Sequence, residues 1–262
     1  MTHLSHNRNA WNQPKGEYSR WTVPVDSDTI SRARAGDWSL LLTPSLPVPA
    51  AWFGEVSGLR ILCLASGGGQ QAPVLAAAGA EVVSFDLSDR QLEQDRIVAE
   101  RDGLSLVCKQ GDMADLSRFA DAAFDLIFHP VSNVFVPDLA PVWRECFRVL
   151  APGGRLLAGV MNPALFMFDH DEGDVTGRLE IKYALPYTDT ESLTPEALAA
   201  RKADLEPLEF SHSLDTQLGG QLAAGFLLAG FYEDAWHDET WVFSRYCPVS
   251  FATLAMKPVD AG

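Results

Sequence analysis

Long hydrophobic runs are missing from this sequence. Of its 262 residues 47% are hydrophobic, but no apolar stretch approaches the roughly 20 residues that a helix needs to cross a bilayer. Residues 1–21 are polar and have no apolar centre like that of a signal peptide. We therefore expect a soluble, cytoplasmic protein without a membrane partner.

Cysteine is scarce, and its positions argue against a disulfide framework. The four cysteines (Cys63, Cys108, Cys146 and Cys247) are far apart and contain no CxxC pair. Three of them lie in apolar strand or helix patterns, which is typical of buried free thiols in a reducing compartment. A metal site is not expected either, because His170 and its acidic neighbours match no known ligand spacing.

Basic residues are also few. The chain has 20 Lys and Arg against 35 Asp and Glu, which gives a net charge of −15. Binding to a nucleic-acid backbone requires clustered Lys and Arg, so we do not expect a nucleic-acid partner. More than half of the excess negative charge lies between Pro163 and Asp215, where 12 acidic residues accompany 4 basic ones. We interpret this segment as a solvated surface, with selection for a cationic substrate as the alternative.

What the sequence does contain is a regular alternation of strand-like and helix-like segments after residue 58. Strands that are almost continuously apolar are expected when helices cover both faces of a sheet. The predicted strands are 59–65, 81–86, 104–108, 124–129 and 154–161. The predicted helices are 70–79, 88–102, 138–150 and 216–226, and two strand-like runs follow at 231–239 and 249–258. The pattern predicts an α/β fold, in which the Pro-Gly-Gly stretch at 152–154 ends the preceding helix.

The alternation divides the chain into four parts. Residues 1–57 form a lead segment of loops and helix that covers the ligand edge of the sheet. Residues 58–162 form the ligand-binding core, and residues 213–262 complete it with a helix and the last two strands. Residues 163–212 break the alternation, and we expect this insertion to lie over the carboxyl edge of the sheet as a substrate cap.

Two short helices are expected outside the core. One lies within 27–42, and the other has Thr194 as its N-cap and Pro195 at its first helical position. The lead segment also carries the aromatic residues Trp11, Tyr18, Trp21, Trp38 and Trp52. These aromatics either anchor the segment on the main domain or help to cover a ligand.

The most informative stretch is LRILCLASGGG at 59–69. An apolar run stops at a glycine cluster, a helical pattern follows, and a second apolar run ends at Asp86. The order strand, tight loop, helix, strand, acid is the one that begins a nucleoside-binding sheet. Small residues let the backbone approach a ligand closely, and a carboxylate at the second strand tip can accept hydrogen bonds from both ribose hydroxyls.

A glycine turn of this kind fits two cofactor classes. Gly67, Gly69 and Ala72 satisfy the loose dinucleotide fingerprint. Three further features decide against a nicotinamide. Asp112 follows the third strand near where an adenine would lie, the fourth strand ends in polar and small residues, and RVLAPGGRLL makes the turn into the fifth strand.

With these motifs in this order, residues 59–161 resemble the class I S-adenosylmethionine (SAM)-dependent methyltransferases, in particular the small-molecule methyltransferase group. The resemblance resumes at the helix QLGGQLAAGF and the last two strands. It implies a Rossmann-like seven-stranded methyltransferase sheet with helices on both faces. It also implies SAM as the cofactor, S-adenosylhomocysteine as the product, and an O, N or C nucleophile of a small molecule as the methyl acceptor. A monomer and a homodimer are both compatible with the sequence.

The resemblance also assigns the cofactor site. In that family the glycine loop cradles the methionyl part, the acid after the second strand holds the ribose, and an Asp-Met pair after the third strand holds the adenine. Carried over, the cofactor-binding residues are Ala65, Ser66, Gly67, Gly69, Asp86, Leu87, Asp112, Met113 and His129.

Two positions depart from the family pattern. Cys63 stands where many members carry an acid, and Ala65 replaces the first glycine. Because alanine disfavours a positive φ, we expect the loop to be shaped slightly differently here.

Methyl transfer from a sulfonium needs a nucleophile held in line and kept from water, and a base is optional. His129, which follows FDLIF at the end of the fourth strand, should lie at the sheet edge near the methyl group. It is our candidate for a base or a substrate-orienting group; alternatively it hydrogen-bonds backbone or cofactor without taking a proton. His212, just before the helix that follows the insertion, is a second candidate. Ser132 and Asn133 either cap the loop or touch substrate. The aromatic and apolar residues Phe166, Met167, Phe168, Tyr183 and Tyr187 either line a substrate pocket or pack the insertion onto the domain.

The leading hypothesis is a SAM-dependent methyltransferase. An NAD-dependent oxidoreductase that uses the same glycine turn is the first alternative, and a non-catalytic nucleoside-binding protein is the second. Thermal stabilisation of the protein by SAM or S-adenosylhomocysteine, with none from NADH, would select the methyltransferase over the oxidoreductase.

Overall fold

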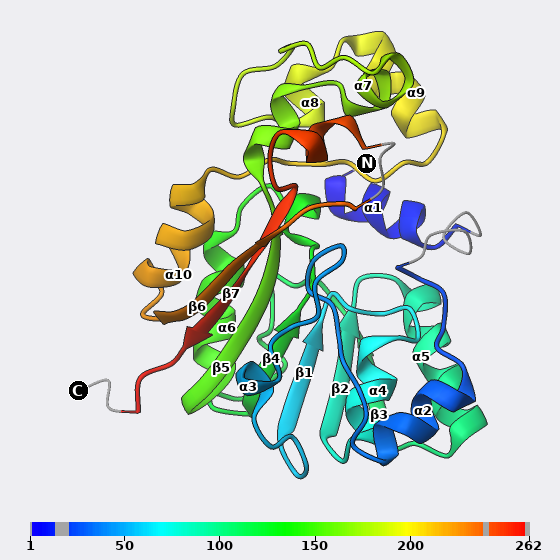
Figure 1. Ribbon diagram of the computed structural model, residues 1–262, viewed down its shortest axis with the longest axis vertical. Helices are drawn as coiled ribbons and strands as arrows, with labels where there is room; N and C mark the ends of the chain where they lie inside the picture. The colour runs from blue at the N-terminus through cyan, green and yellow to red at the C-terminus, as the bar shows by residue number, and fades with distance from the viewer. Residues whose placement is uncertain (1, 14–20, 238–240, 260–262) are drawn as a thin grey trace.

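The computed structural model describes residues 2–13, 21–237 and 241–259, and its centre is a seven-stranded sheet (Figure 1). The strand order is β3-β2-β1-β4-β5-β7-β6. β1 to β5 are parallel, whereas β7 runs antiparallel between β5 and β6. The strands are β1 Arg60–Leu64, β2 Glu81–Asp86, β3 Leu106–Gln110, β4 Phe124–His129, β5 Leu150–Met161, β6 Leu227–Asp234 and β7 Ser250–Met256.

Helices flank this sheet and cover its upper end. Before and within the parallel part lie α1 His3–Trp11, α2 Ser27–Arg34, α3 Ala50–Phe53, α4 Gln71–Ala77, α5 Asp89–Asp102 and α6 Ala140–Val149. Later in the chain come α7 His170–Thr176, α8 Asp189–Ser192, α9 Pro195–Ala203 and α10 Gly220–Ala223. The 3₁₀ segments are η2 Asn133–Phe135, η3 Pro163–Met167 and η5 Val242–Arg245, and η4 Asp215–Gly219 is a short π-helix. None of the described helices is long and apolar enough to cross a membrane.

The alternation of side chains along the strands builds a core on each face. Cys63 of β1 belongs to a cluster that includes Ile30 of α2 and Phe53 of α3. Its neighbour Leu62 points to the opposite face and belongs to a cluster that includes Trp143 of α6. Because both faces are buried, the strands read as nearly continuous apolar runs. The prediction of an α/β sheet with helices on both faces is confirmed.

Most predicted elements are found, and the errors fall at boundaries. β2 and β4 have the predicted bounds, but α6 ends at Val149 and β5 already begins at Leu150. The expectation that 152–154 ends the helix is therefore wrong. Leu150 pairs with Phe124 of β4, and Gly153 N–H donates to the Lys257 carbonyl at 2.9 Å, so strand pairing takes up this stretch.

The C-terminal helix is shorter than expected. It begins as the π-helix η4, continues as α10 and ends before Gly225, whose φ of +107° is outside the helical range. β6 then starts at Leu227 and pairs with β7 from there, so the strand predicted at 231–239 begins too late. Residues 238 and 239 of that prediction lie outside the described residues.

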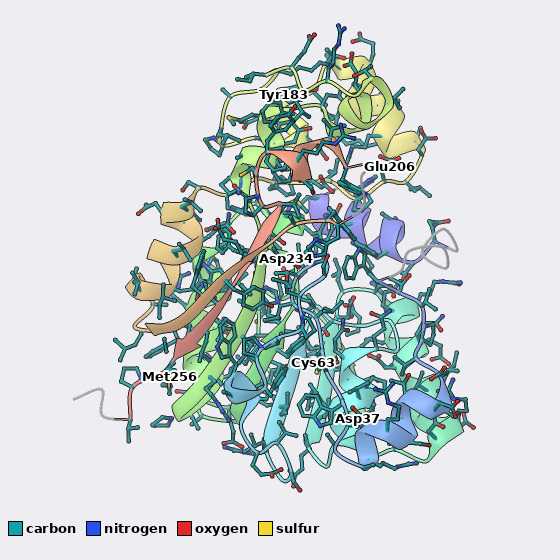
Figure 2. All side chains as sticks on the ribbon, viewed as in Figure 1. Asp37, Cys63, Tyr183, Glu206, Asp234 and Met256 are labelled. Atoms are coloured by element: carbon teal, nitrogen blue, oxygen red, sulfur yellow. The ribbon has the colours of Figure 1, made fainter. Side chains whose placement is uncertain are left out.

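Residues 163–212 carry α7, α8 and α9, which lie together at the top of Figure 1, above the sheet. The predicted N-cap is confirmed, because Thr194 Oγ1 accepts from Ala197 N–H at 3.2 Å. Tyr183, labelled in Figure 2 within this group, has its ring centroid 5.0 Å from that of Tyr187, which stacks on Phe166 at 5.5 Å. These rings share a buried cluster with residues of η5 and of the approach to β7. Of the two interpretations for the aromatics of this segment, packing is the one observed.

Candidate functional site

A cavity opens at the carboxyl ends of the parallel strands, where ligands bind in open α/β sheets. The residues at and just after the ends of β1, β2, β3 and β4 supply part of its lining: Ala65, Ser66, Gly67, Phe85, Asp86, Leu87, Gly111, Asp112, Met113, Pro130, Val131 and Ser132. Other segments of the chain, most of them distant in sequence from these strand ends, supply much of the rest: Leu4, Asn7, Trp11, Trp21, Thr22, Leu41–Pro44, Val134–Val136, Met161, Glu209, Trp236, Val249 and Ser250. β7 is antiparallel to β5 and pairs Ser250 with Met161, so the beginning of β7 reaches the same edge.

Asp86 joins the glycine loop to the tip of β2. Its Oδ2 accepts from Gly67 N–H at 3.0 Å, and its Oδ1 accepts from Ser88 N–H at 2.8 Å. Burial raises the pKa of Asp86, while these backbone donors act in the opposite direction. Each carboxylate oxygen keeps a lone pair for a second donor, so the group can still accept hydrogen bonds from two ligand hydroxyls.

The loop after β1 takes the shape that the family pattern assigns to glycine. Ala65 has φ +49°, in the left-handed region, and its N–H donates to the Phe85 carbonyl at 2.7 Å. The alanine therefore adopts a conformation that it disfavours. At Gly67 a Cβ would lie 2.8 Å from Gln91 Cβ and 3.2 Å from Asp86 Oδ2, so only glycine fits between the loop and α5.

Gly69 does not line the cavity, in contrast to its predicted contact with the cofactor. Its N–H donates to Asp95 Oδ1 at 2.7 Å, and a Cβ there would lie 2.9 Å from Pro24 Cβ. The second oxygen of Asp95 accepts from Ser84 Oγ at 2.5 Å. Burial raises the pKa of Asp95 to about 7, with Asp86 adding to the shift. Gly69 thus anchors the loop to a buried carboxyl of α5 and lies outside the cavity lining.

Asp112 and Met113 line the same cavity as Asp86. Gly111 N–H donates to the Asp86 carbonyl at 2.9 Å, which holds the ends of β3 and β2 together. Asp112 Oδ1 accepts from Ala114 N–H at 2.9 Å and forms a tight turn. The shared cleft expected for the two carboxylates is therefore present, with Leu87 beside them.

His129 does not face the cavity. The ring is fully buried, and it lies edge-on to Trp143 of α6 with centroids 6.3 Å apart. Nδ1 lies 2.9 Å from the Leu64 carbonyl, and Nε2 lies 2.7 Å from the side-chain amide of Asn133. Burial lowers the pKa of His129, so the ring is neutral and donates its one proton, on Nδ1, to that carbonyl.

The second nitrogen of His129 is then a hydrogen-bond acceptor. The Asn133 amide satisfies it when its nitrogen faces the ring, an orientation that also pairs the Asn133 Nδ2, which otherwise has no partner among the described residues. Neither nitrogen remains for proton transfer or for ligand. Of the alternatives for His129, bonding to backbone is observed, and the expectation that it faces the reacting methyl group is not met.

His212 is also turned away from the cavity. Its Nε2–H donates to the Val136 carbonyl at 2.9 Å and the Asn133 carbonyl at 3.1 Å, and burial lowers its pKa. The contact it makes shapes the loop after β4. Ser132 lines the cavity, and its hydroxyl donates to the Pro130 carbonyl at 3.0 Å, so it caps the loop; its contact with substrate stays a prediction.

The N-terminal helix α1 closes the cavity from above, and its existence was not expected. Asn7 accepts from Leu208 N–H at 2.7 Å and donates to the Leu208 carbonyl at 3.0 Å and the Phe135 carbonyl at 3.2 Å. His6 Nε2 lies 2.8 Å from the carbonyl of Glu206, labelled in Figure 2. Just after the helix, Asn12 Oδ1 accepts from Ser88 Oγ at 2.6 Å. The helix therefore links residues 206–208 to the loop after β2.

The aromatics of the lead segment divide between two tasks. Trp11 and Trp21 line the cavity, whereas Trp38 and Trp52 pack against the core beneath the sheet. Tyr18 lies outside the described residues.

Asp234, labelled at the upper end of β6 in Figure 2, fixes the neighbouring loop by accepting from Ser45 N–H at 2.6 Å.

Gln91 and Ser250 are two polar lining residues that the sequence did not indicate. Gln91 Oε1 and Ser250 Oγ are both buried without a hydrogen-bond partner among the described residues. A glutamine on α5 and a serine opening a strand carry no sequence signal for a site. Their position at the cavity results from packing.

All titratable side chains among the described lining residues are acids. They are Asp86, Asp112 and Glu209, and neither Lys, Arg nor His lines the cavity within the described part of the chain. Arg201 lies 3.6 Å from Glu209 and forms a closer ion pair with Asp189 at 2.9 Å. The sheet-edge part of the cavity, around Asp86 and Asp112, is therefore suited to a cationic or neutral ligand.

Comparison with known proteins agrees with this geometry. Residues 62–158 match the family model described as a methyltransferase domain. The uncharacterized methyltransferase YbaJ of Bacillus subtilis is 46% identical over 254 residues, which cover 97% of this chain and 98% of that protein. Two crystal structures of SAM-dependent methyltransferases share the fold. The one from Mesorhizobium loti has a TM-score of 0.59 at 21% identity, and the match covers 79% of this chain and 94% of that one. The one from Methanosarcina mazei has a TM-score of 0.55 at 17% identity, and the match covers 80% of this chain and 96% of that one. The chain belongs to the methyltransferase family, and its fold is the one found in these SAM-dependent methyltransferases.

Proposed function

We propose that the cavity holds SAM along the tips of β1, β2 and β3 and takes a small-molecule methyl acceptor beside the loop after β4. The observation that carries this assignment is the shared cleft of Asp86 and Asp112, which adjoins the glycine turn. In this arrangement Asp86 accepts from the ribose hydroxyls, and Asp112 with Met113 holds the adenine. Ala65, Ser66 and Gly67 face the methionyl part, and Leu87 packs beside the ribose.

The residues present fit this cofactor. The unpartnered Gln91 Oε1 beside the glycine turn is an acceptor that a bound ligand donor would satisfy. SAM carries a sulfonium charge, which an acidic lining favours. A dinucleotide carries two phosphates, and none of the described lining residues supplies a cation to pair with them. The charge distribution therefore supports SAM over a nicotinamide dinucleotide.

When bound, SAM supplies an activated methyl group. The chain's own contribution is to orient the acceptor and exclude water, which can supply several kcal/mol of barrier lowering. Trp11 and Trp21 cover the cavity, and α1 ties this cover to the rest of the fold. Since His129 and His212 are both engaged with backbone, transfer relies on positioning rather than on a histidine base. The enclosure by the lead segment and by Glu209 supports a small molecule as acceptor.

We also propose a cytoplasmic location, supported by the thiols. The four cysteines are free, and burial raises the pKa of Cys63 and Cys146. Such thiols persist in reducing compartments.

The test is isothermal titration calorimetry with S-adenosylhomocysteine on the Asp86→Asn and Glu81→Gln variants. Glu81 is exposed at the opposite end of the same strand and serves as the matched control. We expect Asp86→Asn to weaken binding roughly 10- to 100-fold, because charge-assisted hydrogen bonds are lost, and Glu81→Gln to leave it unchanged. Equal affinity of wild type and folded Asp86→Asn would refute the ribose assignment.

A further inference from the structure

The acceptor part of the cavity has apolar, aromatic walls. Met161 and Val249 line it at the β5–β7 edge, and Phe135 and Val136 line it after β4. Trp21 and Trp236 contribute from opposite ends of the chain, with ring centroids 5.7 Å apart at an interplanar angle of 54°. Flat indole and phenyl surfaces bury large apolar area and pack well against rings.

Ser250 places a buried hydroxyl without a hydrogen-bond partner among the described residues in this wall. The residue is 2% exposed. Its chain neighbour Val249 and its cross-strand partner Met161 on β5 are apolar. Its partner on β6 is Asp234, whose carboxylate is engaged by the N–H groups of Ser45 and Leu46. A buried polar atom of this kind is normally paired, so the hydroxyl marks a point where a ligand supplies the partner.

The charged side chains of the cavity lining narrow the class of acceptor further. An anionic acceptor would find no cation among the described lining residues. Glu209, the acid of this part, already has Arg201 Nη2 as a cationic partner at 3.6 Å, which it shares with Asp189 at 2.9 Å and Glu206 at 3.5 Å. An uncharged ligand matches both facts, because burying an unpaired charge is costly.

From these observations, and given the proposed function, we infer that the methyl acceptor is an uncharged, ring-bearing apolar molecule with one hydroxyl or carbonyl oxygen that hydrogen-bonds to Ser250 Oγ. Ser250 is then a positioning residue that sets the orientation of the ring system in the aromatic walls. Met161, which ends β5 and pairs with Ser250, packs along the acceptor ring on the same side of the cavity as Ser250.

The probes are 2-naphthol and naphthalene, which share a ring system and differ by one hydroxyl. They are titrated by ligand-observed NMR into full-length protein saturated with S-adenosylhomocysteine. We expect wild type to bind 2-naphthol roughly threefold to tenfold more tightly than naphthalene, the range of one hydrogen bond. Ser250→Ala should bring this ratio to about one.

Ser211→Ala is the matched control. Ser211 Oγ is also buried without a partner among the described residues, but Ser211 does not line the cavity, so this variant should keep the wild-type ratio. Melting curves establish that both variants fold, and the ratio in wild type tests the inference independently of any variant.

The inference is overturned if the loaded wild type binds neither probe, shows no preference for 2-naphthol, or binds 2-naphthoate or 2-naphthylmethylamine more tightly. It is also overturned if folded Ser250→Ala keeps the wild-type ratio. Saturation with S-adenosylhomocysteine is measured first by calorimetry. Its failure contradicts the proposed cofactor site, whereas failure of the probe arms alone contradicts only the acceptor class.

Discussion

The buried carboxyl of Asp95 should make stability depend on pH in an unusual direction. Asp95 is fully buried on α5, where it accepts from Gly69 N–H and Ser84 Oγ. Burial raises its pKa from 3.8 to about 7 in the folded chain. Between these two values the folded state binds more protons than the unfolded state, so the free energy of unfolding falls as pH rises.

The size of the effect follows from the two pKa values. Their difference, from 3.8 to about 7, corresponds to about 4 kcal/mol over the full titration. The two titration curves place about 3 kcal/mol of this loss between pH 5 and pH 8. Burial lowers the pKa of His129, which has the opposite effect, because stability from a neutral buried ring is lost as pH falls. Wild type alone therefore shows only the sum of such contributions.

Asp95→Asn isolates the carboxyl. The amide oxygen can accept from Gly69 N–H, and the amide nitrogen can donate to Ser84 Oγ, so both contacts survive without a charge. Urea unfolding at pH 5 and pH 8 should show the variant gaining about 3 kcal/mol relative to wild type at the higher pH. Asp89→Asn, which removes an exposed carboxylate from the same helix, is the control and should show no such gain. A constant difference between Asp95→Asn and wild type across this range would refute the reasoning.

Three further outcomes are expected. Ala65→Gly should raise the melting temperature by about 1–3 °C and Ala65→Val should lower it, since φ is +49° at this residue; the reverse order in a thermal melt would contradict the strained turn. His129→Ala should lower the free energy of unfolding by about 3 kcal/mol in urea while the Kd for S-adenosylhomocysteine stays within about threefold, and loss of binding by a folded variant would return His129 to the ligand site. Asn7→Ala should cost about 2–4 kcal/mol, because buried backbone groups of Leu208 lose their partners; a change below about 0.5 kcal/mol would show that α1 is not held by this residue.

The sheet edge that carries the cavity could be located from sequence because it depends on local pattern. Asp86 ends an apolar run, and parallel strands bring their carboxyl ends to one edge, so Asp86 and Asp112 share a cleft. The direction of His129 was harder to read. It lies two residues after Ile127 on β4, and Ile127 packs in the cluster that contains Trp143, so strand alternation turns the histidine toward α6.

Boundaries were misplaced where long-range pairing outweighs local signals. Residues 150–154 read as a helix end and a turn, but pairing with β4 and with Lys257 extends β5 through them. The aromatic walls of the cavity could not be found at all from sequence. Trp21, Trp236 and Ser250 meet only after the lead segment folds over the sheet and β7 enters it in reverse.

The sequence by itself determined the α/β alternation, the glycine turn and the acids at the strand tips, because each follows from the spacing of apolar, small and acidic residues along one local segment. Tertiary structure alone decided which side chains enter the cavity: it turned His129 and His212 toward backbone carbonyls and placed the buried hydroxyl of Ser250 in the cavity wall. The physical reason is that burial and hydrogen-bond pairing are settled among residues distant in sequence, where local pattern has no influence.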